Sequence, residues 1–241
     1  MIKINTTPLL SIVIPTMNEE KCLPLLLSSI ANQSFNDYEI IVADHNSIDN
    51  TLQIAKQYGA TITSGGLPGK GRNCGAAVAQ GELILFLDAD VILPAACFLS
   101  NIINEFQEKE FGVATCQIRP ISERQIDFAL HQSYNLFMLS TAAFLPHAPG
   151  FCILIKKNIH QLIQGFDEAI LLAEDSDYVQ RAGKISKFGI LNSQKIKVSV
   201  RRLDKDGRIN IAWKYILAGL HLWTIGAPKD DRFKYKFGGY K

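Results

Sequence analysis

The hydrophobic positions in the first 95 residues predict alternating strands and helices. Four short aliphatic or β-branched runs have the length of buried strands, at residues 10–14, 38–43, 60–63 and 82–87. Helical spacing of apolar residues separates these runs, at residues 19–32, at a stretch that begins at Asp49 or Asn50 and ends at Gln57, and at residues 72–80. This alternation is typical of a parallel sheet covered by helices.

The pattern becomes less regular after residue 95, without a repeat or a long linker. Pro94 stands where a helix would begin, and further helices are expected at residues 124–143, 176–182 and 209–225. Strands are expected at residues 112–119, 151–155 and 196–200. A length of 241 residues with 47% hydrophobic residues fits a single core. We therefore expect one α/β domain over residues 1–200, followed by a tail over residues 201–241.

The net charge of +2 conceals two unequal parts of the chain. Residues 201–241 carry ten Lys and Arg against four Asp, which gives +6, whereas residues 1–200 carry −4. A near-neutral chain gives no reason to expect nucleic acid as a partner. The sequence shows no secretory leader and no apolar run long enough to cross a membrane, and its five cysteines lack metal-ligand spacing. These features predict a cytoplasmic protein with reduced, mostly buried thiols.

Four polar segments follow predicted strands, at residues 15–20, 44–49, 69–73 and 88–90. Ligands of open parallel sheets gather at the carboxyl ends of the strands, so these segments are expected to converge. In an extended chain positions i and i+2 face the same side, so Asp88 and Asp90 would enter the cleft together. Their hard oxygens suit Mg²⁺ or Mn²⁺. The alternative is an ordinary turn, in which Asp is common.

Two other segments each allow a functional and a structural interpretation. The glycine-rich stretch at residues 65–71 is neither a Walker loop nor a dinucleotide fingerprint, but Lys70 and Arg72 could meet phosphate oxygens. The alternative is a flexible loop with solvated cations. Glu174, Asp175 and Asp177 open a predicted helix, where carboxylates usually act as caps. Their mutual repulsion could instead raise one pKa toward that of a general base.

Five motifs occur in an order that is informative as a set. They are residues 11–19 (Ser-Ile-Val-Ile-Pro-Thr-Met-Asn-Glu), residues 44–51 (Asp-His-Asn-Ser-Ile-Asp-Asn-Thr), residues 69–72 (Gly-Lys-Gly-Arg), residues 86–90 (Phe-Leu-Asp-Ala-Asp) and the acidic stretch at residues 165–177. Over residues 9–182 the chain resembles glycosyltransferase family 2, the inverting nucleotide-sugar enzymes. The resemblance implies a GT-A fold with a Rossmann-like, mostly parallel central sheet flanked by helices. It also implies a nucleotide-binding half at residues 1–95 and an acceptor-binding half at residues 96–200.

The resemblance further implies how the donor is bound. Pro15 and Glu19 would lie along the nucleoside, and Asp44 would accept a hydrogen bond from the N–H of the base, typically uracil. Lys70 and Arg72 would lie near the base or the diphosphate. The donor is therefore expected to be a nucleotide sugar, and most simply one linked to UDP.

The resemblance also implies a metal site and a catalytic base. Asp88 would hold the ribose or a phosphate, and Asp90, with Asp88, would bind the Mn²⁺ or Mg²⁺ ion that bridges the diphosphate. Either His147 or His221 could add a third ligand, although surface or hydrogen-bonded histidines are the alternative. Asp175 would deprotonate the acceptor hydroxyl, which then attacks the anomeric carbon from the face opposite the nucleotide.

Departures from the family pattern affect the base and the mode of transfer. His45 and Asn46 replace the second aspartate and glycine that often follow the position of Asp44. The Gln-x-x-Arg-Trp motif of processive members is absent, which favours transfer of a single sugar. Arg201 and Arg202 stand in that region and, with Glu174, could contact the acceptor or the diphosphate; a solvated arginine pair is the alternative.

The tail predicts a C-terminal amphipathic helix, because apolar and aromatic residues recur at helical spacing over residues 209–225. It would either pack on the core or lie on a membrane surface, where aromatic and basic residues are favoured. The second interpretation predicts a peripheral enzyme at the inner face of the membrane, acting through residues 209–241 on a lipid-linked or cell-envelope glycan. A sugar nucleotidyltransferase and a non-catalytic or degenerate nucleotide-sugar binding module are the competing functions.

Overall fold

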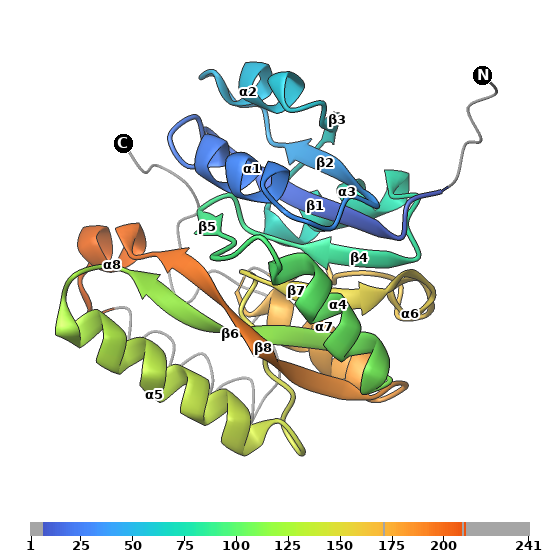
Figure 1. The fold of residues 1–241 in the computed structure, drawn as a ribbon, viewed down its shortest axis with the longest axis vertical. Coiled ribbons are helices and arrows are strands. Elements are labelled where there is room, and N and C mark those ends of the chain that lie inside the picture. The colour runs from blue at the N-terminus through green and yellow to red at the C-terminus, as the bar shows by residue number, and fades with distance from the viewer. Residues whose placement is uncertain (1–6, 171, 209, 211–241) are drawn as a thin grey trace.

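The computed structural model describes residues 7–170, 172–208 and 210. Within these residues the strands form an eight-stranded mixed sheet with the order β3-β2-β1-β4-β7-β6-β8-β5 (Figure 1). The strands are β1 (Leu10–Thr16), β2 (Tyr38–Asp44), β3 (Thr61–Ser64), β4 (Leu83–Phe86), β5 (Val91–Ile92), β6 (Val113–Ile121), β7 (Ile153–Lys156) and β8 (Phe188–Ser199). The helices are α1 (Leu23–Ala31), α2 (Thr51–Gln57), α3 (Pro68–Val78), α4 (Phe98–Glu108), α5 (Gln125–Thr141), α6 (Lys157–Leu162), α7 (Glu174–Gly183) and α8 (Arg201–Asp206).

The sheet joins both halves of the chain. Strands β3, β2, β1 and β4 run parallel to one another, as the alternating pattern predicts. Strand β7 is antiparallel to both β4 and β6, β6 is parallel to β8, and β5 is antiparallel to β8. The α/β class is confirmed. The parallel part of the sheet carries the segments that follow the first strands.

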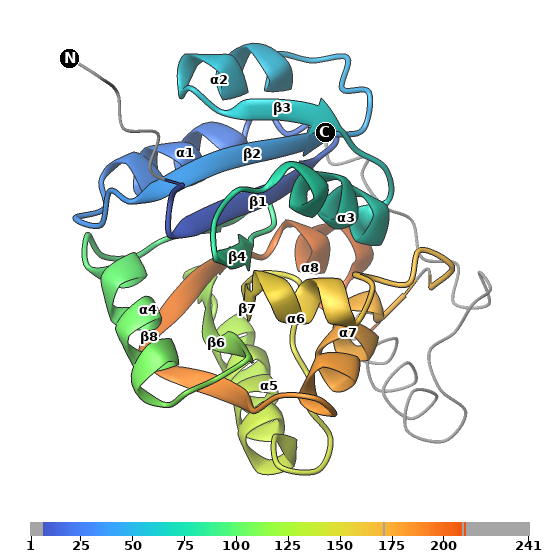
Figure 2. The same cartoon turned by 90° about the vertical axis from the view of Figure 1, so that its right-hand side faces the viewer.

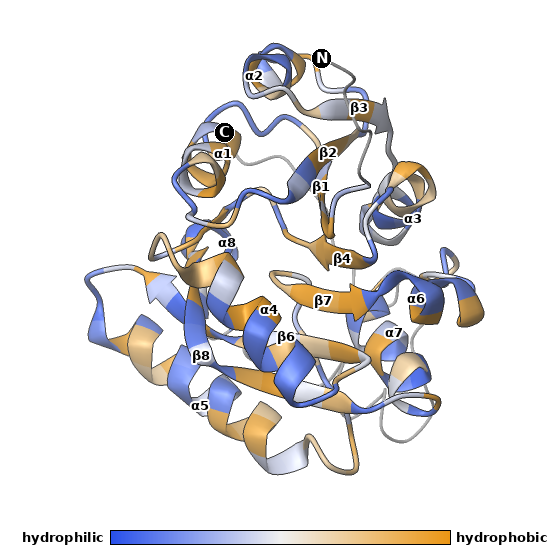
Figure 3. Cartoon of the chain, turned by 45° about the vertical axis from the view of Figure 1, so that its right-hand side comes forward, coloured by the Kyte–Doolittle hydropathy of each residue, from blue (hydrophilic) through white to orange (hydrophobic). Residues whose placement is uncertain are grey.

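Alternating side chains of β1 bury the two faces of the sheet. Ile12 packs in a cluster that includes Leu27 of α1 and Ile102 of α4. Val13 points to the other face, in a cluster that includes residues of α3 and Tyr178 of α7. Figure 2 shows the helices on both sides of the strands, and Figure 3 shows that the central strands are the most apolar part of the fold. Burial on both faces explains the continuous apolar runs in the sequence.

Helix α3 lies very close to β1 because a glycine faces that strand. A Cβ atom at Gly75 would lie 2.3 Å from Cγ1 of Val13, so position 75 has no room for a side chain. The close approach brings the first turn of α3 to the carboxyl end of the sheet. This turn carries Lys70 and Arg72.

Several element boundaries differ from the predicted ones. Helix α3 begins at Pro68, so Lys70 lies in a helical turn and not in a flexible loop. Helix α1 begins only at Leu23. Strand β1 continues through Pro15, whereas the sequence predicts a stop there. Pairing with β4 ends at Val13, so beyond that point Pro15 faces β2 alone and its missing N–H costs the sheet little.

The second half departs further from the prediction. Pro94 does not begin a helix, because β5 ends just before it and α4 starts at Phe98. Strand β8 starts at Phe188 and is much longer than the predicted strand at residues 196–200. The hydrophobic pattern also misses α6 and the two-residue β5. Short elements of this kind carry too few residues to show a period.

The cysteines and the tail were also the subject of predictions from the sequence. All five cysteines are free. Cys116 and Cys152 are buried neighbours, with 3.3 Å between their sulfur atoms, but Cys22 and Cys74 are only partly buried and Cys97 is exposed, so the expectation of mostly buried thiols is wrong. No helix in the part of the chain that the structure describes is both long and apolar enough to cross a membrane. Of the tail, residues 201–208 and Asn210 are described, whereas the remainder of the predicted helix at residues 209–225 and of the tail lies outside the described residues.

Candidate active site

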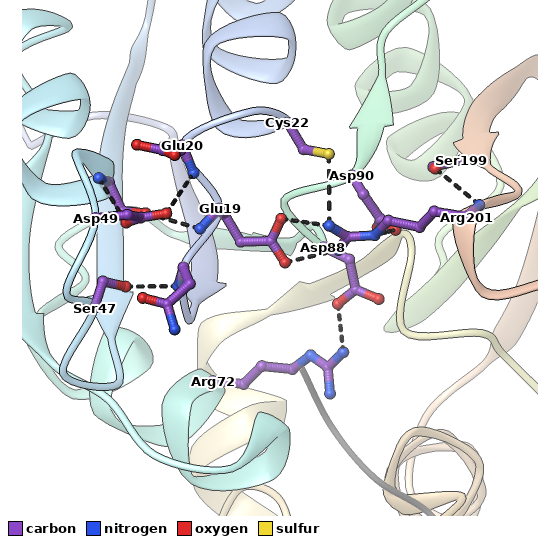
Figure 4. A network of polar contacts seen from close by, with 12 residues as sticks. Glu19, Glu20, Cys22, Ser47, Asp49, Arg72, Asp88, Asp90, Ser199 and Arg201 are labelled. Atoms are coloured by element: carbon purple, nitrogen blue, oxygen red, sulfur yellow. Dashed lines mark hydrogen bonds and ion pairs between the residues drawn. The ribbon is translucent and has the colours of Figure 1, made fainter. Parts of the chain in front are cut away.

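The carboxyl ends of β1, β2 and β4 bring the predicted polar segments together. Strands β1 and β2 are paired up to their last residues, Thr16 and Asp44, and β4 lies on the other side of β1. Glu19 follows β1, and Asp88 and Asp90 follow β4, so their side chains gather at one edge of the sheet (Figure 4). The predicted convergence at this edge is confirmed for these segments.

Asp44 is held by hydrogen bonds at the end of β2. Its carboxylate accepts from the hydroxyl of Thr16 (2.9 Å), the hydroxyl of Ser47 (2.6 Å) and the backbone N–H of Ser47 (2.8 Å). The side chain is buried, and Asn46 adopts a left-handed conformation with φ of 52° that turns the chain back toward it. A carboxylate has about four acceptor positions, so one remains for a ligand N–H.

The loop after β1 is fastened to the start of α2. The backbone N–H of Glu19 donates to the hydroxyl of Thr51 (2.8 Å), and that of Glu20 donates to Asp49 (3.1 Å). Burial alone would raise the pKa of Asp49, but hydrogen bonds from Thr51 and Glu20 together lower it. Asp49 therefore acts as a charged anchor that fixes the loop carrying Glu19.

Asp88 and Asp90 lie in the turn between β4 and β5. Strand β4 ends at Phe86, so both carboxylates lie beyond the strand, close to its carboxyl end. Each carboxylate faces a different guanidinium group: Asp88 pairs with Arg72 at 2.8 Å, and Asp90 pairs with Arg201 at 2.9 Å. Asp90 lies in a turn, as the alternative of an ordinary turn predicts. Both side chains line the same edge of the sheet.

Arg72 lies beneath this edge and not in solvent. Its side chain is only 2% exposed and makes ion pairs with Asp88 (2.8 Å) and Glu174 (2.9 Å). The guanidinium also lies 5.4 Å from the centre of the Phe166 ring. Gly150 leaves the space that it occupies, since a Cβ atom there would be 2.2 Å from Nη2 of Arg72. Arg72 thus links the turn after β4 to the start of α7.

The acidic residues at the start of α7 have different surroundings. Glu174 pairs with Arg72 at 2.9 Å, and Asp177 pairs with Arg181 at 2.7 Å. Among the described residues Asp175 has no ion-pair partner within 4.0 Å; it accepts a hydrogen bond from the backbone N–H of Ser176 at 2.8 Å. Asp175 is therefore the acid in this turn that is left available for a substrate.

The pKa values in this turn are shifted in the direction that general-base chemistry needs. Burial raises the pKa of Asp175 above its ordinary value, and the Arg72 guanidinium opposes the rise. Burial and the charge of Asp175 raise the pKa of Glu174 to about 7. A carboxylate with a raised pKa binds a proton more tightly, so the pair is better suited to take a proton than an exposed carboxylate would be.

Arg201 closes the opposite side of the edge. It is the first residue of α8, directly after β8, and its guanidinium bridges Glu19 and Asp90. Burial raises the pKa of Asp90 to about 6, although Arg201 opposes the rise. The pairing contradicts the alternative of a solvated arginine at this position. Arg202 also lies in the first turn of α8.

The residues at this edge could bind a divalent cation, but the protein would supply few of its ligands. Asp88 and Asp90 offer hard carboxylate oxygens, and the bound guanidinium of Arg201 marks the carboxylate of Asp90 as a place that favours positive charge. Within the described residues no group of three or more His, Cys, Asp or Glu side chains is arranged to hold an ion. His147 instead makes a 2.7 Å hydrogen bond with Ser176. A metal here would need oxygen ligands from the donor.

Some residues of the site carry no signal in the sequence. Gly150 belongs to an irregular segment before β7 and reaches the site only because the fold places this segment against Arg72. His147 of the same segment, a candidate metal ligand from the sequence, instead lies against Ser176 of α7. Phe166 stacks on Tyr178 with 3.8 Å between ring centres and supports the start of α7.

Lys70 is exposed and lines a small depression together with Glu168 and Glu174.

Comparisons with known proteins identify the family of this chain. The model of Glycosyl transferase family 2 matches residues 11–164. The poly(ribitol-phosphate) beta-N-acetylglucosaminyltransferase TarS of Staphylococcus aureus is 40% identical over 90 residues, which are 33% of this chain and 16% of TarS. The poly(ribitol-phosphate) beta-glucosyltransferase of Bacillus spizizenii is 33% identical over 138 residues, which are 52% of this chain and 22% of the relative. The chain thus spans less than a quarter of the length of these relatives.

Solved structures show the same fold. The structure of S. aureus TarS residues 1–349 in complex with UDP-GlcNAc has a TM-score of 0.66 at 22% identity, and the match covers 89% of this chain and 73% of that chain. The mannosyltransferase PcManGT of Pyrobaculum calidifontis, in complex with GDP-Man and Mn²⁺, has a TM-score of 0.71 at 19% identity, covering 93% and 67%. These neighbours show that the fold is the GT-A fold, as the resemblance implies. The family model matches more than half of the sequence, so the chain belongs to glycosyltransferase family 2.

Proposed function

We propose that the chain transfers one sugar from a UDP-linked donor to an acceptor hydroxyl, with inversion at the anomeric carbon. The observation that carries the proposal is the position of Asp175. It stands in the first turn of α7 without an ion pair among the described residues, next to the Arg72 pairs that also hold Asp88. A base at this point and a donor site around Asp88 would face the same reacting centre.

The donor would lie along the carboxyl ends of β1, β2 and β4. Asp44 would accept from the uracil N–H, because three hydrogen bonds orient its carboxylate and leave an acceptor position open. Pro15 and Glu19 would line the nucleoside. Lys70, exposed in the first turn of α3, would approach the diphosphate.

Asp90, supported by Asp88, would hold Mn²⁺ or Mg²⁺. When bound, the ion would neutralise the charge that develops on the departing diphosphate. Arg72 would keep Asp88 in place, since it binds that carboxylate from the buried side. Arg202 would add positive charge near the diphosphate from the start of α8.

In the transfer step Asp175 would take the proton of the acceptor hydroxyl. The acceptor oxygen would form a bond to the anomeric carbon while the bond from that carbon to the diphosphate oxygen breaks, and the electron pair would leave with UDP. Glu174 would stay with Arg72 and hold the first turn of α7 in position. The raised pKa of Asp175 would make proton removal more favourable.

The acceptor would be a lipid-linked or cell-envelope glycan. Relatives named for poly(ribitol-phosphate) and for 4,4'-diaponeurosporenoate support this class of acceptor. The basic, aromatic tail at residues 209–241 would hold the enzyme at the inner face of the membrane. Vesicle co-sedimentation of the full chain and of a chain ending at Arg208 tests this location, because equal, negligible binding by both would contradict it.

A base-deficient variant tests the catalytic proposal. Asp175→Asn should keep UDP binding in calorimetry with Mn²⁺ but lose sugar transfer and donor hydrolysis. Asp177→Asn is the matched control. It removes a carboxylate from the same helical turn, but this carboxylate is already paired with Arg181. Equal transfer by wild type and Asp175→Asn would refute the role of Asp175. Donor binding without turnover in the wild type, across a panel of acceptors, would favour a binding module.

A further inference from the structure

The guanidinium of Arg201 occupies the centre of a carboxylate cluster at the donor edge. Its two terminal nitrogens donate to both carboxylate oxygens of Glu19 at 2.7 Å, and its Nε donates to Asp90 at 2.9 Å. The three side chains come from the loop after β1, the turn after β4 and the start of α8 (Figure 4). Arg201 thus ties together three segments that are distant in the sequence.

The cluster needs a cation to be stable. The side chains of Glu19 and Asp90 are only 11% and 13% exposed, and that of Arg201 is 23% exposed. Carboxylates this close to each other and this poorly hydrated are unfavourable unless positive charge compensates them. Arg201 supplies this charge in the protein alone.

A divalent cation at Asp90 would meet the same carboxylate and the same local field. Two cations so close to each other repel, and a metal bound there would also remove acceptor capacity from the Asp90 carboxylate. We propose that Arg201 is a resident counter-cation that a divalent metal must displace from Asp90. The donor diphosphate, which carries negative charge, then becomes the new partner of the displaced guanidinium.

This arrangement couples metal binding to donor binding. Without a nucleotide, a metal that binds to Asp90 must break the contact between Arg201 and Asp90, and no diphosphate is present to pair with the displaced guanidinium. With the diphosphate present, both cations have anionic partners, so the metal binds more tightly. Arg201 is therefore a positioning residue that sets the order and affinity of metal binding. The inference rests on the metal site of the proposed function, but not on sugar transfer.

The inference can be tested without turnover by titrating the protein with Mn²⁺ alone. Binding is measured as the decrease in the EPR signal of the free ion. Arg201→Gln should bind Mn²⁺ about tenfold more tightly than the wild type, and should gain less affinity when UDP is added. Arg201→Lys should have an affinity for Mn²⁺ between those of the two, since the ammonium group keeps the charge but cannot contact Glu19 and Asp90 together as the planar guanidinium does. Arg124→Gln is the charge-matched control, because Arg124 is exposed and forms a surface ion pair with Asp204. This variant should bind Mn²⁺ like the wild type.

Circular dichroism checks that each variant is folded. If Arg201→Gln does not fold, the comparison of Mn²⁺ affinity between Arg201→Lys and the wild type tests the inference. Affinity for Mn²⁺ that is unchanged or weaker in the folded Arg201 variants overturns the inference. Absence of Mn²⁺ binding to every chain overturns it too. Sugar transfer in a metal-free assay would then leave the proposed transfer intact, so the two failures are distinguishable.

Discussion

Replacing Arg72 by Met tests the buried ion pairs that join the donor edge to α7. The substitution keeps an unbranched side chain but removes the guanidinium that pairs with Asp88 and Glu174. Glu174 is 10% exposed, whereas Asp88 is 31% exposed and can be hydrated by water. The free energy cost should therefore come mainly from Glu174, which loses its buried counter-ion.

The expected loss of unfolding free energy is about 3 kcal/mol. Removing one partner of a buried ion pair costs about 3–5 kcal/mol, because a charge is left without compensation. The lower figure applies here because Glu174 can escape part of the penalty by taking up a proton: its pKa is already raised to about 7 by burial and by Asp175, and the loss of Arg72 would raise it further. A loss of this size is a large part of the stability of an ordinary domain.

Urea unfolding followed by circular dichroism measures this loss. Arg124→Met is the control, since it removes an exposed ion pair with Asp204 and should cost well under about 1 kcal/mol. Arg72→Met combined with Glu174→Gln should recover part of the stability, because the uncompensated charge is gone. A loss below about 1 kcal/mol for Arg72→Met, or no recovery in the double variant, would refute the reasoning.

Three further predictions concern packing, donor recognition and pH. Gly75→Ala should lower the unfolding free energy by about 1–3 kcal/mol in thermal scans, because its Cβ would lie 2.3 Å from a methyl group of Val13; an unchanged melting temperature would contradict the tight packing. Asp44→Ala should weaken UDP binding in calorimetry by about tenfold, since a hydrogen bond to a charged group is lost, and unaltered affinity would exclude Asp44 from base recognition. The folded-state pKa of Glu174 is raised from 4.5 to about 7, so the folded chain holds this proton more tightly than the unfolded chain. Unfolding free energy should then fall as pH rises through that interval, and Glu174→Gln should show a shallower fall in urea titrations; equal slopes would contradict the shift.

The hydrophobic pattern predicted the centre of the parallel half of the sheet well because β1 and β4 are buried on both faces. The runs at residues 10–14 and 82–87 overlap β1 and β4 closely, and the polar residues after them mark the functional edge. Boundaries at α1 and α3 were less predictable, because hydrogen bonds and close packing with distant segments decide where those helices start.

The side-chain partners of the site could not be predicted from local patterns. Asp88 and Asp90 are two residues apart, yet they bind arginines 16 and 111 residues away along the chain. Which of the acids at the start of α7 remains unpaired depends on Arg72, which α3 supplies, as well as on Arg181, which lies four residues after Asp177 in α7 itself. Residue types and spacing identify the site, whereas long-range pairing determines what each group does.

The space above Arg72 has a consequence for the history of this sequence. Gly150 has no room for a methyl group, since one would lie 2.2 Å from the guanidinium. A side chain at position 150 becomes acceptable only if position 72 first loses its bulk, and Arg72 in turn is tied to Glu174. Homologues that carry a larger residue at position 150 should therefore also differ at position 72, so that the two positions covary although 78 residues separate them.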